Sequence, residues 1–188
     1  MPKIADIQET PNPNAVKFIL KDAVSYGTSH SFKSYESAAA DALAGSIFDV
    51  GDVVSVFYMD KMITVEKTDE AEWDEILPLL AAPIRAAEGL TAKNGNGSAA
   101  VAVGGALAAA ASDDPKLAEI EALLDERIRP YLAGDGGWLE IVELAENTLK
   151  IRYQGACGSC PSSLTGTLMA IENMIRDEVD STIEVIAV

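Results

Sequence analysis

The chain has 188 residues, 48% of them hydrophobic, and a formal net charge of −16. This length is enough for one large domain or two small ones. Acidic residues outnumber basic ones in both halves, 1–90 and 115–188, which argues against nucleic-acid or anionic-membrane partners, and no apolar run approaches the roughly 20 residues of a membrane-spanning helix.

The first half of the chain predicts two β-hairpins covered by helices. Its strand segments alternate apolar and polar residues or are rich in β-branched ones, and residues 10–14 contain two prolines and two asparagines that favour a turn. Strands are expected over 3–8, 16–21, 53–58 and 62–67, and helices over 35–48 and 69–88. Pro78 and Pro83 should kink or split the second helix, and His30 is expected in a solvated loop.

Residues 91–114 differ from both flanking regions in composition. They combine a polar Asn/Gly/Ser stretch with a run of small residues, which cannot fill a core, so we expect a flexible linker. The predicted fold is therefore α+β with two small domains, 1–90 and 115–188, each a mostly antiparallel sheet covered by helices.

The second half predicts the order α-β-β-α-β. A helix should begin at Pro115 and bury one face that runs from Leu117 to Tyr131, and the glycines of residues 134–137 should end it. A hairpin is expected over 138–144 and 148–153, a second helix over 161–177 and a closing strand over 182–188.

Cys157 and Cys160 are the only cysteines, and they lie between a predicted strand and a predicted helix that begins at Pro161. Unpaired amides and the dipole at a helix N-terminus favour thiolate over thiol, which makes cysteines there better ligands and nucleophiles. Gly155 and Gly158 should let the backbone turn so that both sulfur atoms point the same way.

Several interpretations of this pair remain open on the residues alone. The cysteines could be two buried small side chains, a thioredoxin-like dithiol, or ligands of zinc or of an iron–sulfur cluster. A four-thiolate site needs twice the ligands that one chain supplies, so either metal site predicts a homodimer in which both copies contribute Cys157 and Cys160. Composition does not distinguish zinc from iron–sulfur.

Two sets of residues carry a resemblance to a known family. Residues 8–14 and 16–19, with 54–57, 63–67 and Trp73, resemble the N-terminal domain of Nfu-type iron–sulfur proteins. Residues 128–137 and 155–163 resemble the C-terminal domain of the NifU/Nfu family. After the Asp-Gly-Gly turn, where the family more often has an acidic or amide residue, this chain has Trp138.

The resemblance implies a scaffold or carrier of iron–sulfur clusters rather than an enzyme. Cys157 and Cys160 would hold a [4Fe–4S] cluster, or alternatively a [2Fe–2S] cluster, shared with the same residues of a second chain. Upstream assembly proteins would supply the cluster and apo iron–sulfur proteins would accept it.

Two further expectations concern the location and the first domain. The N-terminus lacks a signal-peptide pattern and two cysteines are too few for a disulfide-stapled secreted protein, so we expect a soluble protein of the bacterial cytoplasm, or of the mitochondrial matrix if a transit peptide has been removed. The first domain contains no catalytic constellation, which leaves it a structural or partner-docking role. In an adaptor of that kind the cluster would be secondary.

Overall fold

The structure is a computed structural model that describes residues 3–87, 115–156 and 161–188, with side chains from residue 165 in the last range. The chain divides into two compact units, 1–106 and 107–188. Residues 91–114, the predicted linker, lie outside the described residues, so the bounds 1–90, 91–114 and 115–188 remain predictions. No helix within the described ranges has the length and apolar character needed to cross a bilayer.

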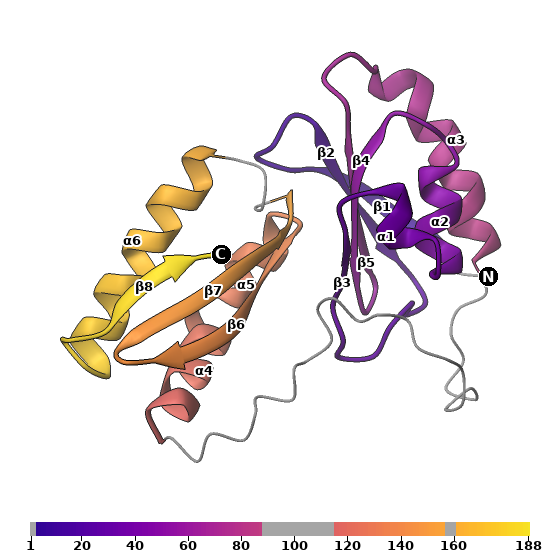
Figure 1. The fold of residues 1–188 in the computed structure, drawn as a ribbon. Coiled ribbons are helices and arrows are strands. Elements are labelled where there is room, and N and C mark those ends of the chain that lie inside the picture. The colour runs from indigo at the N-terminus through magenta and orange to yellow at the C-terminus, as the bar shows by residue number, and fades with distance from the viewer. Residues whose placement is uncertain (1–2, 88–114, 157–160) are drawn as a thin grey trace. The chain divides into compact units, whose positions relative to one another are not determined.

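The first unit is a five-stranded antiparallel sheet with its helices on one face (Figure 1). Its strand order is β1-β2-β5-β4-β3, so the two predicted hairpins are present and lie next to each other. Its elements are β1 (Ile4–Glu9), β2 (Ala15–Leu20), β3 (His30–Phe32), α1 (Tyr35–Ala38), α2 (Ala42–Phe48), β4 (Val53–Met59), β5 (Met62–Lys67) and α3 (Trp73–Ala86).

The core of this unit fills the space between the sheet and the helices. Phe18, Ile63 and Ile84 are each fully buried in it. The β-branched and aromatic residues that alternate along the central strands supply its sheet side. The helical side comes from Ile76, Leu80 and Ile84 of α3 together with residues of α1 and α2.

Three predictions for the first unit were wrong in detail. Residues 35–48 form two short helices, because the Asp41 carboxylate accepts the Ala44 N–H at 2.7 Å and so starts a new helix. His30 lies in strand β3, half-buried, with its ring stacked 4.6 Å from that of Tyr58. The prolines were expected to kink or split the helix over 69–88; α3 is not split, since it continues through Pro78 and Pro83 while its apolar face packs on the sheet, and the kink remains a prediction.

The proline and asparagine turn is a polar network that ties β1 and β2 to the rest of the unit. Asn12 is 7% exposed, its side-chain oxygen accepts the Asn14 N–H at 3.0 Å, and its amide donates to Glu66 Oε1 at 3.2 Å. The Trp73 indole donates to the Pro13 carbonyl at 3.0 Å. The turn therefore joins β5 and the start of α3, which is a structural role.

Asn12→Ala is expected to lower the free energy of unfolding of the first unit by about 1–3 kcal/mol, because it removes a buried amide and takes one hydrogen-bond partner from each of the half-buried Asn14 and Glu66. Urea unfolding followed by the fluorescence of Trp73 would measure it. Gln8→Ala on exposed strand β1 is the control and should change the free energy by less than about 0.5 kcal/mol. Equal effects of the two substitutions would contradict the role of the network.

The second unit is a three-stranded sheet, β6-β7-β8, with a separate core beneath its helices. The β6–β7 hairpin turns at Glu146 and Asn147, which have φ of 48° and 67°, as a tight two-residue hairpin turn requires. Its elements are α4 (Pro115–Arg127), α5 (Arg129–Gly134), β6 (Gly137–Ala145), β7 (Thr148–Gly155), α6 (Pro161–Glu178) and β8 (Glu184–Ala187).

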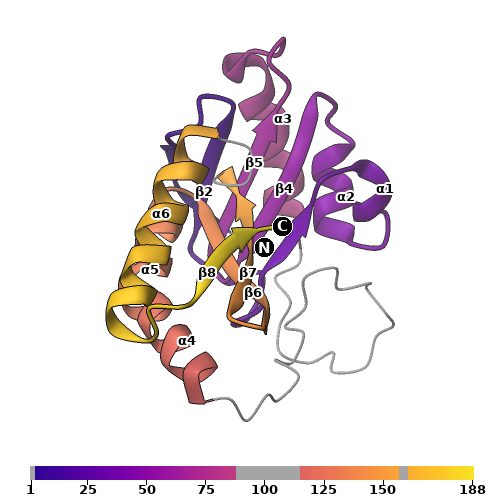
Figure 2. The ribbon, with the colours of Figure 1, turned by 60° about the vertical axis from the view of Figure 1, so that its left-hand side comes forward.

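Two features of this unit differ from the prediction of one continuous first helix and a mostly antiparallel sheet. The first predicted helix breaks at Ile128, just before Pro130, and the change in helical phase leaves Tyr131 76% exposed rather than on the buried face. Strand β8 pairs parallel to β7, because α6 carries the chain back along the sheet and packs beside β8 (Figure 2).

Candidate functional site

The strand and helix predicted on either side of the two cysteines are both present. Strand β7 ends at Gly155, and helix α6 begins at Pro161. Cys157 and Cys160 themselves lie outside the described residues, so their roles as ligands remain predictions. The structure instead defines the two elements that flank the cysteine segment, the end of β7 and the start of α6.

The glycine turn after α5 holds the last described residue before the cysteines. Gly137 and Gly155 pair across β6 and β7, and the Ala156 N–H donates to the Gly136 carbonyl at 3.2 Å. Gly136 has a φ of 77°, and Ala156 is 3% exposed. The turn thereby fixes the start of the cysteine segment, a role that the sequence alone did not reveal.

Gly136→Ala should destabilise the second unit by about 1–2 kcal/mol, because a side chain at this positive φ meets the backbone. Gly134→Ala is the matched control, since Gly134 ends a helix and a Cβ there would meet nothing within 4 Å. Urea unfolding of both variants, followed by the fluorescence of Trp138, would compare them. Equal stability of the two variants would contradict the account of the turn.

Arg129 organises the side chains next to this turn. Its guanidinium pairs with Glu121 at 2.7 Å and with Asp125 at 2.5 Å, and its Nε donates to the Leu139 carbonyl at 3.1 Å. It also lies 5.4 Å from the centre of the Trp138 ring. Burial works to lower the pKa of Arg129, but the hydrogen bonds and charges of the two carboxylates outweigh it and raise the pKa.

Trp138 stands at the start of β6, opposite Gln154 of β7. It thus connects the paired Arg129 to the strand that leads to the cysteines. Trp138, which stands where the family more often has an acidic or amide residue, therefore packs against the Arg129 guanidinium. The ion pairs could have been found from the sequence, because Glu121 and Asp125 lie eight and four positions before Arg129 on the same face of the predicted helix. The hydrogen bond from Arg129 to Leu139 of β6 could not, since the two residues belong to different elements.

Gln154 is the buried polar residue nearest in sequence to the cysteine segment. It is 2% exposed, and its amide donates to Glu140 at 3.1 Å, while its Oε1 has no donor among the described residues. Burial raises the pKa of Glu140, against the opposing charges of Arg152 and Arg129. Strand β7 therefore carries, three positions before Cys157, a buried acceptor to which no described residue donates.

The described residues contain no candidate metal centre of their own. Among them no three His, Cys, Asp or Glu side chains are grouped as a metal ion would need. His30 lies in the first unit, where it stacks on Tyr58, and burial lowers its pKa although the charge of Asp41 acts the other way. Cys157 and Cys160, the two cysteines of the sequence, remain the candidate thiolate ligands.

Two family models match the chain, one in each unit. A model described as the N-terminal part of the scaffold protein Nfu/NifU matches residues 4–88, and one described as a NifU-like domain matches residues 120–186. Together they cover most of the chain.

Curated relatives match across both units. A protein of Drosophila willistoni named "NFU1 iron-sulfur cluster scaffold homolog, mitochondrial" is 33% identical over 188 residues, which cover 95% of this chain and 62% of the relative. "NifU-like protein 4, mitochondrial" of Arabidopsis thaliana is 34% identical over 178 residues, covering 92% of this chain and 61% of the relative. The chain thus spans about three fifths of the length of these relatives.

Among solved structures, the solution NMR structure of a NifU-like protein from Saccharomyces cerevisiae is similar to part of the chain. It is 27% identical, with a TM-score of 0.37, and the match covers 42% of this chain and 72% of that one.

Proposed function

The chain belongs to the Nfu family of iron–sulfur cluster scaffold proteins, and on this premise we propose that two copies hold one [4Fe–4S] cluster between them through Cys157 and Cys160 and transfer it to apo iron–sulfur proteins. The observation that carries the proposal is the position of these cysteines between the end of β7 and the start of α6, next to a turn fixed by hydrogen bonds.

The homodimer follows from the number of ligands. A [4Fe–4S] cluster takes four cysteine thiolates, and each chain has two. A twofold axis that brings the two segments together completes the set without any further residue. A [2Fe–2S] cluster would satisfy the same four ligands and is the alternative cargo.

The chemistry of transfer follows from the same arrangement. The cluster is cargo, so its ligands must release it as well as hold it. Thiolates shared across a dissociable contact between two chains can be exchanged for those of an acceptor one side at a time, by ordinary ligand substitution at iron. The protein then needs no catalytic acid, base or nucleophile, and we propose that it is not an enzyme.

The partners and the compartment belong to the same proposal. Upstream cluster assembly proteins supply the cluster, apo iron–sulfur proteins receive it, and neither nucleic acid nor a membrane takes part. We place the chain in the bacterial cytoplasm, with the mitochondrial matrix as the alternative because the matched relatives carry mitochondrial names.

The test of the function is reconstitution without oxygen. The protein is purified anaerobically and supplied with iron and sulfide, and its iron, acid-labile sulfide and zinc are then measured together with the Mössbauer spectrum. The proposal expects iron and sulfide in equal amounts with the signature of a [4Fe–4S] cluster. Tightly bound zinc without sulfide would contradict it, and so would a reversible disulfide in a protein that binds no iron.

Transfer is tested by mixing the loaded protein with an apo [4Fe–4S] protein of the same cell in the presence of an iron chelator. The acceptor should gain its cluster faster from the loaded protein than from free iron and sulfide, since the chelator captures iron that leaves the scaffold. Equal rates from both sources would contradict direct transfer.

A further inference from the structure

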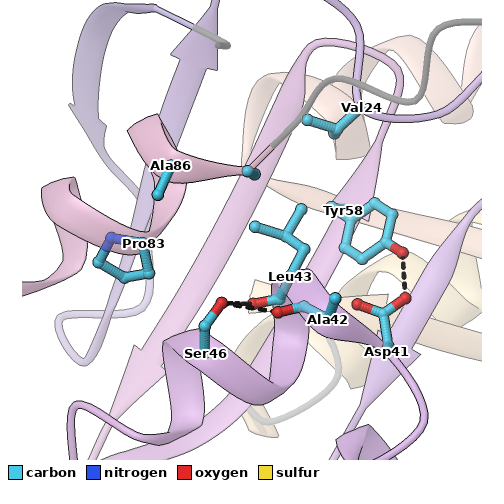
Figure 3. Close-up of a pocket in the computed structure, with 9 residues that line it drawn as sticks. Val24, Asp41, Ala42, Leu43, Ser46, Tyr58, Pro83 and Ala86 are labelled. Carbon is cyan, nitrogen blue, oxygen red and sulfur yellow. Dashed lines mark hydrogen bonds between the residues drawn. The ribbon is translucent and has the colours of Figure 1, made fainter.

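The first unit contains a hollow that the cluster function does not use. Its volume is about 480 Å³, within the range of pockets that bind small molecules or a few side chains. It lies between helices α2 and α3, with strand β4 behind it (Figure 3). We call it the Asp41 hollow; it is lined by Val24, Asp41, Ala42, Leu43, Ser46, Tyr58, Pro83, Ala86 and Ala87.

Most of the lining is apolar, and the apolar surface continues along α3. Pro83 and Ala86 face the hollow from that helix, and Leu79, one turn before Pro83, is 55% exposed. Residues at spacings of four and three share one face of a helix, so these three form a stripe that leads out of the hollow. An exposed leucine that extends an apolar hollow is typical of a surface that docks a protein segment.

The polar end of the hollow is built from Asp41 and Tyr58. The Tyr58 hydroxyl donates to Asp41 Oδ2 at 2.6 Å (Figure 3). The Ala44 N–H donates to Asp41 Oδ1 at 2.7 Å. Burial, together with the hydrogen bond to Asp41, raises the pKa of Tyr58 far above its usual value, so the phenol keeps its proton and stays a donor.

Among the described residues that line the hollow, Asp41 is the one that carries a charge. A carboxylate offers about four acceptor positions, and the two hydrogen bonds from Tyr58 and Ala44 leave room for more. Ser46 does not compete for them, because its hydroxyl donates to the carbonyls of Ala42 and Leu43 in its own helix. The hollow is therefore apolar with a fixed anionic acceptor at one end.

We propose that the Asp41 hollow docks a segment of the acceptor protein that presents a branched apolar side chain next to a lysine or arginine. The apolar side chain fills the space against Leu43 and Pro83, and the cation pairs with Asp41. The charge of the chain favours such a partner, because a surface with a net charge of −16 attracts basic segments. This inference rests on the proposed function, and it identifies the Asp41 hollow as the site at which the protein recognises its acceptor.

The first experiment tests the hollow without any cluster. The probe is 3-methylbutylammonium, which carries a leucine-like branch and a cation, titrated into the full chain while the methyl NMR signals of Val24 and Leu43 are followed. We expect saturable shifts at these methyls, with affinity at least about tenfold weaker for the anion 3-methylbutanoate, which has the same branched end, since the Asp41 carboxylate repels it. No saturable shift, or equal affinity for both probes, would overturn the proposal.

Two substitutions and two matched controls locate the binding. Asp41→Asn keeps the helix cap but removes the charge, and Ala86→Leu fills the hollow from an exposed position; each should weaken the probe at least about tenfold. Glu36→Gln removes an exposed charge of α1, and Ala82→Leu enlarges an exposed alanine of α3 outside the lining. Equal probe affinity in all four variants would overturn the assignment to the hollow.

The second experiment asks whether an acceptor protein uses the site. Ala86→Leu and an excess of the probe should each slow cluster transfer to the apo acceptor at least about threefold, with iron and sulfide loading unchanged and Ala82→Leu at the wild-type rate. Probe binding with unchanged transfer would show a site for small amines only and would overturn the docking proposal. A failure of loading in every form would instead contradict the proposed function, and the probe titration would still test the hollow.

Discussion

Replacing either Cys157 or Cys160 by serine is expected to abolish retention of the cluster. A serine hydroxyl stays protonated at neutral pH and is a poor ligand for iron, and each substitution removes two of the four ligands of a site shared by two copies. Changes that only touch hydrogen-bonding neighbours of metal ligands cost about 10–100-fold in affinity, so the loss of a ligand should reduce retained iron and sulfide by at least about tenfold.

Ser159→Ala is the matched control, because it changes the segment between the cysteines without removing a thiolate. It should load normally, as measured by iron and acid-labile sulfide after gel filtration without oxygen. A normal cluster in either single cysteine variant would show that the ligands are not two from each chain. If Ser159→Ala also loses the cluster, the cysteine variants act by disturbing the segment as a whole, and their effect does not identify the thiolates as ligands.

Phe18→Ala is expected to destabilise the first unit by about 3–5 kcal/mol, because it removes a fully buried ring from the centre of the core. That is a large share of the roughly 5–15 kcal/mol by which a domain is stable. Since the two units have separate cores, the second unit should keep its thermal transition and its capacity to load a cluster.

Leu149→Ala is the counterpart in the second unit, where Leu149 is fully buried, and it should cost about 2–5 kcal/mol there. The two tryptophans, Trp73 and Trp138, lie in different units, so Trp→Phe backgrounds let fluorescence follow each unit alone. Leu149→Ala should also reduce cluster loading. If both substitutions lower one common transition by equal amounts, the units do not unfold independently and this prediction is wrong.

The hairpins and most helices of the fold were predictable because local periodicity encodes them. Apolar residues that alternate along residues 16–20 and 148–153 face one side of a sheet, and the helical stripe of Ile76, Leu80 and Ile84 faces the same core that the strands build. These patterns are local, and the α+β class that they imply is the one observed.

The features that were missed depend on contacts between distant segments or on single capping residues. Asp41 reads as an interior residue of an alanine-rich helix, yet its hydrogen bonds to Ala44 and Tyr58 divide that helix and create the polar end of the hollow. Tyr131 follows the apolar spacing of α4 but belongs to α5, where the phase differs. The parallel pairing of β8 likewise depends on the path of α6 rather than on the strand's own residues.

The strand and the helix that flank the candidate site were predictable, but the contacts around them were not. A Cys-x-x-Cys pair with glycines before a proline indicates a strand-to-helix connection, and the strand and helix are found at Gly155 and Pro161. The hydrogen bond from Ala156 to Gly136 and the contact of Arg129 with Trp138 join residues about 10–20 positions apart. No local pattern encodes them, because they form only when the hairpin packs against α5.

The central claim, one cluster shared by two chains, is tested most directly by native mass spectrometry of the anaerobically reconstituted protein. The account predicts a species of two chains with one [4Fe–4S] cluster, which separates into monomers without iron when the cluster is removed by chelation. A single chain that carries a complete cluster, or a dimer that carries one cluster in each chain, would contradict it.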